Sequence, residues 1–165
     1  QIDENTEEAK DSIIRLSKMM RHLLYDSESD KIPLQKELDF IKNYVDLMKL
    51  RYSEKVLINL EVPEVISEKT IPPLLFTSFV ENAFRHGVSY RRESTIDIRF
   101  FLAPDRLLFR ISNSIPETPS GEESPGGIGI ENARRRLDLI FGTEYQLDIR
   151  ETSETFDVHL SIPLC

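Results

Sequence analysis

Polar side chains suited to a phosphorylated ligand gather in one short stretch, Glu81-Asn82-Ala-Phe-Arg85-His86. On a helix, Asn82 shares a face with Arg85, three residues on, and with His86, four residues on. An amide oxygen beside a carboxylate suits a hard cation such as Mg²⁺, which keeps waters and shares its ligands with phosphates. Because the stretch ends a strongly apolar segment, the pattern favours a cleft; the alternative is a solvated face of an amphipathic helix.

A second stretch, Gly126-Gly127-Ile-Gly129-Ile130, places glycines at the mouth of an expected helix. Glycines let the backbone approach a ligand closely, and a helix N-terminus offers N–H groups and a positive dipole end to a phosphate. The spacing is neither a dinucleotide-binding fingerprint nor a Walker A loop, since no Lys-Ser or Lys-Thr follows. Phosphate binding and an ordinary glycine-rich turn are both compatible with this pattern.

The hydrophobic pattern indicates the scaffold that holds these stretches. Apolar residues recur every three or four positions from Ala9 to Leu23 and from Leu38 to Tyr52, which predicts two helices joined by the polar run 26–30 and packed as an antiparallel hairpin. Further patterns predict helices over 74–86 and 128–141, and strands over 56–62, 95–102, 106–112, 145–151 and 156–162. This order predicts an α/β (α+β) two-layer sandwich, with a mixed, mostly antiparallel sheet and helices on one face, preceded by an N-terminal helical segment.

Composition narrows the functional classes. The chain has 165 residues, enough for one domain with a helical appendage, and its net charge of −8 argues against non-specific nucleic-acid binding. The single cysteine, Cys165, excludes a disulfide framework and a cysteine-based metal site. The longest mostly apolar stretch, 71–80, contains two prolines and is too short to span a bilayer, and no signal peptide is visible. Since the chain opens at Gln1 without Met, we expect it to be a piece of a longer protein.

Residues outside the two stretches are expected to play lesser roles. The segment 114–127 has three each of proline, glycine, serine and glutamate, which predicts a mobile loop. We expect residues 114–126 of this loop to act as a lid that responds to a bound nucleotide. We expect His22 and His159 to be packing, structural or exposed residues rather than phosphoacceptors. The arginine runs 91–92 and 134–136 either steer a polyphosphate or form solvated faces, and for at least one of the three arginines at 134–136 we favour the solvated face.

Three motifs in order resemble the GHKL (Bergerat-fold) ATP-binding superfamily and, more narrowly, the LytS/YehU-type sensor histidine kinases. They are Leu34-Gln-Lys-Glu-Leu38 with Tyr44 and Leu50-Arg-Tyr52, Pro72-Pro-Leu-Leu-Phe with Val-Glu-Asn-Ala-Phe-Arg-His-Gly87, and Gly127-Ile-Gly-Ile-Glu-Asn-Ala-Arg-Arg-Arg-Leu137. The resemblance covers nearly the whole chain and implies that ATP and Mg²⁺ bind at these motifs.

The resemblance also implies a role for each matching residue. Asn82 would coordinate Mg²⁺, and Glu81 would polarise the attacking group or bind a metal-bound water. Arg85 and His86 would lie near the phosphates. Gly127 and Gly129, with Ile130 beside them, would let the N–H groups of a helix meet the triphosphate.

The adenine position departs from the family pattern. The family usually carries an Asp-x-Gly motif after a strand, whereas this chain has Asn113-Ser114-Ile115. Asn113 is still able to accept a hydrogen bond from the adenine amino group. Asp157, in the last strand, either supplies the missing carboxylate or points to solvent from the open sheet face.

The implied function is that of the ATP-binding catalytic domain of a two-component sensor histidine kinase, which donates the γ-phosphoryl group of ATP to an upstream histidine for relay to a response regulator. The acceptor motif, His followed by Phe-Leu-Phe-Asn, is absent and would lie just upstream of Gln1, so the fragment is expected to be inactive alone. Residues 1–30 would end a dimerisation and phosphoacceptor region, and residues 31–165 would form the catalytic domain. We expect a homodimeric parent held in the inner membrane by other segments, with this part cytoplasmic. A degenerate pseudokinase acting as an interaction module, or a related serine kinase, is the alternative.

Overall fold

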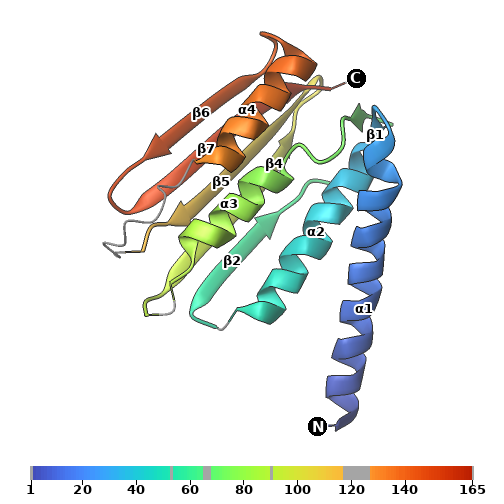
Figure 1. Ribbon diagram of the computed structural model, residues 1–165, viewed down its shortest axis with the longest axis vertical. Helices are drawn as coiled ribbons and strands as arrows, with labels where there is room; N and C mark the ends of the chain where they lie inside the picture. The colour runs from blue at the N-terminus through green and yellow to red at the C-terminus, as the bar shows by residue number, and fades with distance from the viewer. Residues whose placement is uncertain (1, 53, 65–67, 90, 117–126, 165) are drawn as a thin grey trace.

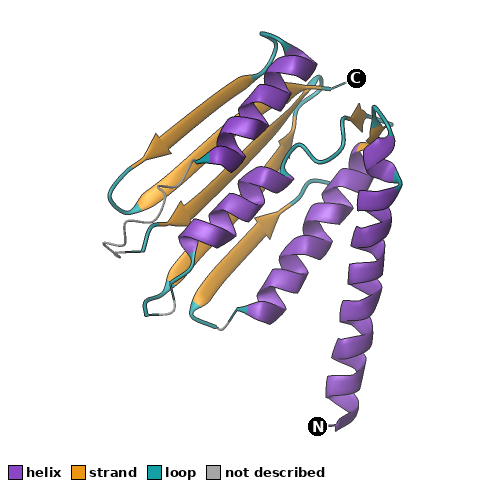
Figure 2. Ribbon diagram, in the orientation of Figure 1, coloured by secondary structure: helices purple, strands orange, loops and turns teal. Residues whose placement is uncertain are grey.

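The computed structural model describes residues 2–52, 54–64, 68–89, 91–116 and 127–164. Its helices are α1 (Ile2–Leu24), α2 (Leu34–Arg51), α3 (Thr77–Gly87) and α4 (Ile128–Phe141), with a 3-10 turn, η1 (Asp26–Glu28). Its strands are β1 (Ile32–Pro33), β2 (Val56–Glu61), β3 (Thr70–Ile71), β4 (Ser94–Leu102), β5 (Arg106–Ser114), β6 (Gln146–Glu151) and β7 (Thr155–Pro163). Helices α2, α3 and α4 cover one face of the main sheet (Figures 1 and 2), which confirms the expected two-layer α/β architecture.

The main sheet has the strand order β2-β4-β5-β7-β6, and β1 pairs separately with β3. Strand β2 runs parallel to β4, and the remaining neighbours are antiparallel, so the expected mixed, mostly antiparallel sheet is confirmed. A parallel pair requires a crossover connection, and here α3 lies within that connection between β2 and β4. The topology therefore seats α3 over the sheet, between α2 and α4 (Figure 1).

Aromatic rings anchor α3 to the sheet. Phe76, which precedes the helix, is fully buried, with its ring centroid 5.0 Å from that of Phe100 on β4 and 4.9 Å from that of Phe109 on β5. Phe79, in the first turn of α3, also contacts Phe109, with 6.0 Å between centroids. Burial of several aromatic side chains is a large stabilising contribution, so the position of α3 is set firmly.

Helices α1 and α2 pack as the expected hairpin, but through a face of α1 that the apolar pattern does not mark. The side chains of the apolar stripe are between 45% and 64% exposed; they are Ile13, Leu16, Met20 and Leu23. The buried positions are instead Met19 and His22, and Arg15 forms an ion pair with Asp46 of α2. The apolar stripe of α1 is therefore left open to solvent in this chain.

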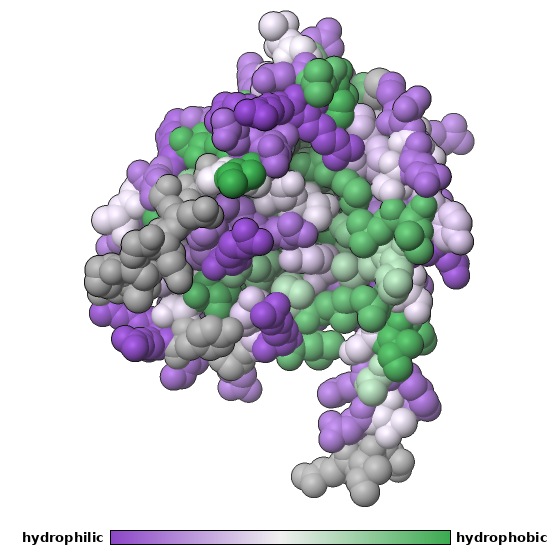
Figure 3. Space-filling model, in the orientation of Figure 1, coloured by the Kyte–Doolittle hydropathy of each residue, from purple (hydrophilic) through white to green (hydrophobic). Residues whose placement is uncertain are grey.

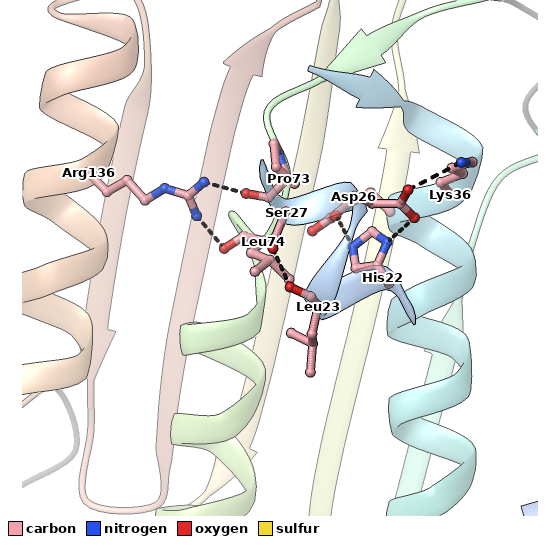
Figure 4. A network of polar contacts seen from close by, with 9 residues as sticks. His22, Leu23, Asp26, Ser27, Lys36, Pro73, Leu74 and Arg136 are labelled. Carbon is pink, nitrogen blue, oxygen red and sulfur yellow. Dashed lines mark hydrogen bonds and ion pairs between the residues drawn. The ribbon is translucent and has the colours of Figure 1, made fainter. Parts of the chain in front are cut away.

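A buried polar cluster explains this choice of face. The ring of His22 is 5% exposed, stacks on Phe40 at 4.5 Å, and lies 3.1 Å from the fully buried carboxylate of Glu37. Its other nitrogen lies 3.2 Å from Asp26, which also pairs with Lys36 (Figure 4). Burial by itself would lower the pKa of His22, but hydrogen bonds and charges from Glu37 and Asp26 outweigh it and raise that pKa above 6.5. The expectation that His22 is a packing residue is confirmed.

Helix α3 begins three residues later than the sequence pattern indicates. Leu74 has φ 60°, a left-handed conformation that a helix does not admit, so the helix starts only at Thr77. Arg136 of α4 donates hydrogen bonds to the carbonyl oxygens of Leu74, at 2.8 Å, and Pro73 (Figure 4). Arg136 is therefore a structural residue, whereas its neighbours Arg134 and Arg135 are exposed.

Candidate functional site

The polar residues of α3 follow one another around the helix surface that faces away from the sheet, with Glu81 nearest α2 and Asn82 and His86 farthest from it. Phe84 is buried and contacts Tyr44 and Tyr52 at the α2 side, and Glu81 and Arg85 line a pocket with it between α2 and α3. Asn82 and His86 each stand two positions from Phe84, which turns them about 160° away at 3.6 residues per turn. Figure 1 shows α4 on that other side. Arg85 lies between Glu81 and Asn82 on this surface, about 60° from Asn82. Its expected place with His86 near the phosphates stays a prediction.

Asn113 occupies the junction between the end of α3 and the end of β5. Its side chain is 2% exposed and donates a hydrogen bond to the carbonyl oxygen of Ser114 at 3.0 Å. The Ser114 hydroxyl donates to the carbonyl oxygen of Gly87 at 3.1 Å. A Cβ atom on Gly87 would lie 2.7 Å from that of Asn113, so only glycine allows this close approach. Strand β5 thus runs two residues further than predicted, because these bonds hold its end against α3.

Asp157 lies on the other face of the sheet from Asn113. In the antiparallel pairing of β5 with β7, Asn113 stands opposite Phe156, which is buried under the helices, and Asp157 stands opposite Ser112. Successive side chains on a strand point to opposite faces, and the Asp157 carboxylate accepts a hydrogen bond from Thr155 at 3.0 Å. The idea that Asp157 compensates for Asn113 is wrong, and its alternative, the open sheet face, is confirmed.

The N-terminus of α4 is built as the glycine pattern indicates. Gly127 precedes the helix, and its carbonyl oxygen accepts hydrogen bonds from Ile130 and Glu131. Gly129 is exposed, with nothing within 4 Å of the position of an added Cβ. Ile130, by contrast, is 3% exposed and its N–H is already bonded. The N–H groups of the first helical positions, Ile128 and Gly129, have no preceding turn to bond to and suit an anion better than Ile130.

Arg51, Tyr44 and Tyr52 also line the pocket beside α3, and the sequence pattern assigned them no chemical role. The pocket has a volume of about 500 Å³. Burial, assisted by the charge of Glu81, raises the pKa of Tyr44 to about 12. The spacing of positions 44, 48, 51 and 52 places them on one stripe of a helix, which could have indicated a binding face. Met48 and Tyr52 are equally typical of a packing face, so the sequence did not distinguish the two.

The sequence also predicted a ligand-responsive loop and a magnesium site. The lid expected to respond to a nucleotide, 114–126, falls mostly on residues 117–126, outside the described residues. Within the described part of the chain, no group of three or more His, Cys, Asp or Glu side chains is arranged to hold a metal ion. His159 is exposed on β7, as expected.

Comparison with known proteins agrees with this architecture. The family model for "Histidine kinase" matches residues 1–56. "Sensor protein LytS" of Staphylococcus saprophyticus is 27% identical over 171 residues, covering 96% of this chain and 29% of that protein. "Sensor histidine kinase/phosphatase LytS" of Staphylococcus aureus is 28% identical over 162 residues, covering 90% of this chain and 28% of that protein. The chain thus spans less than a third of the length of these relatives.

Solved structures share the fold at low sequence identity. The catalytic domain of histidine kinase ThkA superposes with a TM-score of 0.57 at 12% identity, over 81% of this chain and 94% of that one. The histidine kinase domain of the Erythrobacter litoralis blue-light activated kinase gives 0.60 at 18% identity, over 96% and 82%. Full-length ShkA in complex with AMPPNP gives 0.59 at 15% identity, over 98% and 37%. The chain is therefore similar to the LytS sensor histidine kinases over most of its length and shares its fold with solved histidine kinase catalytic domains.

Proposed function

We propose that this chain is the ATP-binding catalytic domain of a two-component sensor histidine kinase, and that it transfers the γ-phosphoryl group of ATP to an upstream histidine for relay to a response regulator. Its homologues are named as sensor histidine kinases, and ShkA, which shares the fold, was solved with AMPPNP, an ATP analogue. Phosphoryl transfer needs mainly positioning and charge neutralisation from the protein, which α3 and the start of α4 are suited to supply.

The observation that carries the nucleotide proposal is the junction of Gly87, Asn113 and Ser114. It places a buried amide at the end of α3 with no intervening side chain. The oxygen of Asn113 would accept a hydrogen bond from the adenine amino group. His86 and Asn82 would lie near the phosphates, and the N–H groups near Gly127 and Gly129 would face phosphate oxygens.

Magnesium fits this arrangement as an ion shared with the nucleotide. The described residues supply no carboxylate cluster for it, but Mg²⁺ is commonly held by one or two protein ligands together with substrate phosphates and waters. The amide oxygen of Asn82 would be such a ligand. When bound, the ion would neutralise charge on the phosphates; Glu81, nearer α2, would accept a proton from the attacking group.

A second candidate, a degenerate pseudokinase acting as an interaction module, is motivated by Asn113, an amide where the family usually has a carboxylate. An amide makes a weaker hydrogen bond than a carboxylate does. The comparisons favour the kinase, because the homologues that match nearly the whole chain are named as kinases.

Dimerisation of the parent protein would use the apolar stripe of α1. Ile13, Leu16, Met20 and Leu23 are spaced 3, 4 and 3 residues apart, as in the seam of a coiled coil. Their side chains are exposed, and apolar groups gather along α1 in Figure 3. A second copy of the chain, presenting the same stripe, would cover them and place residues 1–30 in a dimerisation region.

Contact with a membrane would come only through other parts of the parent protein. None of the helices among the described residues is long and apolar enough to cross a bilayer. We place this domain in the cytoplasm, where ATP and a response regulator are available, beneath an inner-membrane sensor.

Calorimetric titration with ATP tests the proposal. In wild type, affinity should fall when Mg²⁺ is removed with a chelator, and Asn82→Ala should lower MgATP affinity about tenfold, since a ligand worth roughly 1.4 kcal/mol is lost. Binding to Asn82→Ala should also respond much less to Mg²⁺. The control Gln146→Ala, an amide truncation on the edge strand β6, should behave as wild type. No MgATP binding to wild type would refute the proposal.

A further inference from the structure

The pocket between α2 and α3 brings two guanidinium groups and one carboxylate together. Arg51 comes from the last turn of α2, and Glu81 and Arg85 from the facing flank of α3. Glu81 and Arg85 are one helical turn apart, a spacing that often yields an ion pair, yet within the described part of the chain neither forms one. Their charges are therefore available to a group that enters the pocket.

An aromatic wall forms the rest of this pocket. The rings of Tyr52 and Phe84 are stacked, with centroids 5.9 Å apart and planes 7° from parallel, and Tyr44 meets Phe84 edge-on at 6.0 Å. Arg51 is held over the ring of Tyr52, 5.4 Å from its centroid. Because the pKa of Tyr44 is raised to about 12, its hydroxyl keeps its proton and remains a hydrogen-bond donor. The wall suits a planar ring, and the donors suit an anion attached to it.

The chain already binds one imidazole with the same kinds of group. His22 lies flat against Phe40, with 22° between the planes, and its Nε2 lies 3.1 Å from the Glu37 carboxylate. Its Nδ1 lies 3.2 Å from the Asp26 carboxylate, so an aromatic surface and carboxylates hold an imidazole in this fold. The pocket beside α3 offers both, and adds Arg51 and Arg85.

We propose that this pocket receives the imidazole of the acceptor histidine and holds the phosphohistidine that forms there. The imidazole packs against the aromatic wall and donates its N–H to Glu81, while Arg51 and Arg85 contact the phosphoryl oxygens. In the transfer, an imidazole nitrogen forms a bond to the γ-phosphorus of ATP, the bond to the leaving ADP oxygen breaks, and the proton of the other nitrogen passes to Glu81. This inference rests on the proposed function and adds Arg51, Tyr44 and Tyr52 to its machinery.

The charges in the pocket select an imidazole over a phosphorylated carboxylate. An aspartyl phosphate has no N–H to donate to Glu81, and that carboxylate would repel it. Arg85 lies between Glu81 and Asn82 on the exposed surface of α3. The acceptor beside Glu81 and the nucleotide beside Asn82 would therefore meet over Arg85, where the imidazole nitrogen reaches the γ-phosphorus.

Titration with 1-phosphoimidazole, without nucleotide, tests the pocket directly. Two-dimensional NMR on the whole chain should show shifts at the Arg51 and Arg85 side chains. Arg51→Met should weaken binding about tenfold, the loss expected for a hydrogen bond to a charged group. Tyr44→Phe, which keeps the ring and removes only the hydroxyl, should weaken it several-fold. The control Arg150→Met, at an exposed site on β6, should bind as wild type does.

The outcomes separate this inference from the proposed function. If wild type binds MgATP but not 1-phosphoimidazole, or if Arg51→Met and Tyr44→Phe both bind it as well as wild type, the acceptor pocket is refuted and the ATP proposal stands. If 1-phosphoimidazole binding depends on Arg51 while MgATP does not bind, the ATP proposal fails and the pocket remains. Arg51 and Tyr44 line the pocket rather than the core between α3 and the sheet, so their substitution should leave the fold intact. Circular dichroism checks that both variants are folded.

Discussion

The imidazole Nε2 of His22 lies 3.1 Å from a carboxylate oxygen of Glu37, and this pair joins α1 to α2 in a site that water does not reach. Removing one partner of a buried pair leaves the other uncompensated, which costs about 3 kcal/mol. We expect His22→Ala to lower the free energy of unfolding by about this amount. The exposed His159 supplies the control, since His159→Ala should change stability by less than about 0.5 kcal/mol in the same urea titrations.

The stability of the chain should also depend on pH through His22. Its pKa is raised in the folded state, so the charged form stabilises folding fully below pH 6.5, and that contribution is lost as pH rises through the folded pKa. Unfolding free energies measured from mildly acidic to mildly alkaline pH should therefore fall in wild type relative to His22→Gln. Parallel curves for wild type and His22→Gln would contradict the assignment, and His159→Gln should retain the wild-type curve.

Replacement by alanine should lower the free energy of unfolding at Gly87 but not at Gly129. Gly87→Ala places a Cβ 2.7 Å from that of Asn113, so we expect a loss of about 1–3 kcal/mol and weaker MgATP binding. At Gly129 nothing lies within 4 Å, and alanine is the better helix former by up to about 1 kcal/mol. Gly129→Ala should thus keep or gain stability while weakening MgATP binding. Equal nucleotide affinity in Gly129→Ala and wild type would argue against phosphates at this helix terminus.

Arg136 should matter for stability and Arg135 should not. Arg136→Met leaves the carbonyl oxygens of Pro73 and Leu74 without their donor, for an expected cost of about 2 kcal/mol. Arg135 is exposed and pairs only loosely with Glu131, so Arg135→Met should fall within about 0.5 kcal/mol of wild type. Thermal and urea unfolding distinguish the two, and an equal loss in both variants would show that helix propensity, not the bonds to the chain before α3, is responsible.

Substitution of Asn113 should change the nucleotide selectivity of the chain, whereas substitution of Asp157 should not. We expect Asn113→Ala to lower ATP affinity about tenfold and to erode the preference for ATP over GTP, because the acceptor for the adenine amino group is lost. Asp157→Asn should change neither quantity, since that side chain lies on the opposite face of the sheet. A loss of selectivity in Asp157→Asn would contradict the strand register.

Periodicity in the sequence was sufficient for the five strands of the main sheet, for α4 and for the order of layers, because each depends on a local pattern of apolar and polar residues. The two-residue strands β1 and β3 were not predicted, because they are too short to show such a pattern. Gly142, with φ 58°, ends α4 as predicted. The face that α1 presents to α2 was not predictable in this way, since it depends on a buried partner, Glu37, that is distant in sequence. The start of α3 was misplaced for a similar reason: Leu74 takes a left-handed conformation next to carbonyls that Arg136 holds from another helix.

At the candidate site, the sequence placed the four polar side chains of α3 on one helix, and the structure confirms that helix. Spacings of three and four residues placed Asn82 beside Arg85 and His86, and the helix keeps these neighbours. Which adjacent helix each residue faces depends on the tertiary structure, so it could not be read from the spacing. The contribution of α2 was missed, because Arg51 and Tyr44 become site residues only once α2 lies beside α3.

The attachment of α1 has a mechanical consequence. Its contacts with α2 that we describe, from Arg15 to His22, lie in its C-terminal half, and the N-terminal half extends beyond the body of the domain (Figure 1). At 1.5 Å per residue, Asn5 lies about 25 Å from His22 along the helix axis. A tilt of about 10° at the His22 contact would move that distal end by about 4 Å. The Arg15–Asp46 ion pair, which lies between His22 and that end, would have to open for such a tilt to occur.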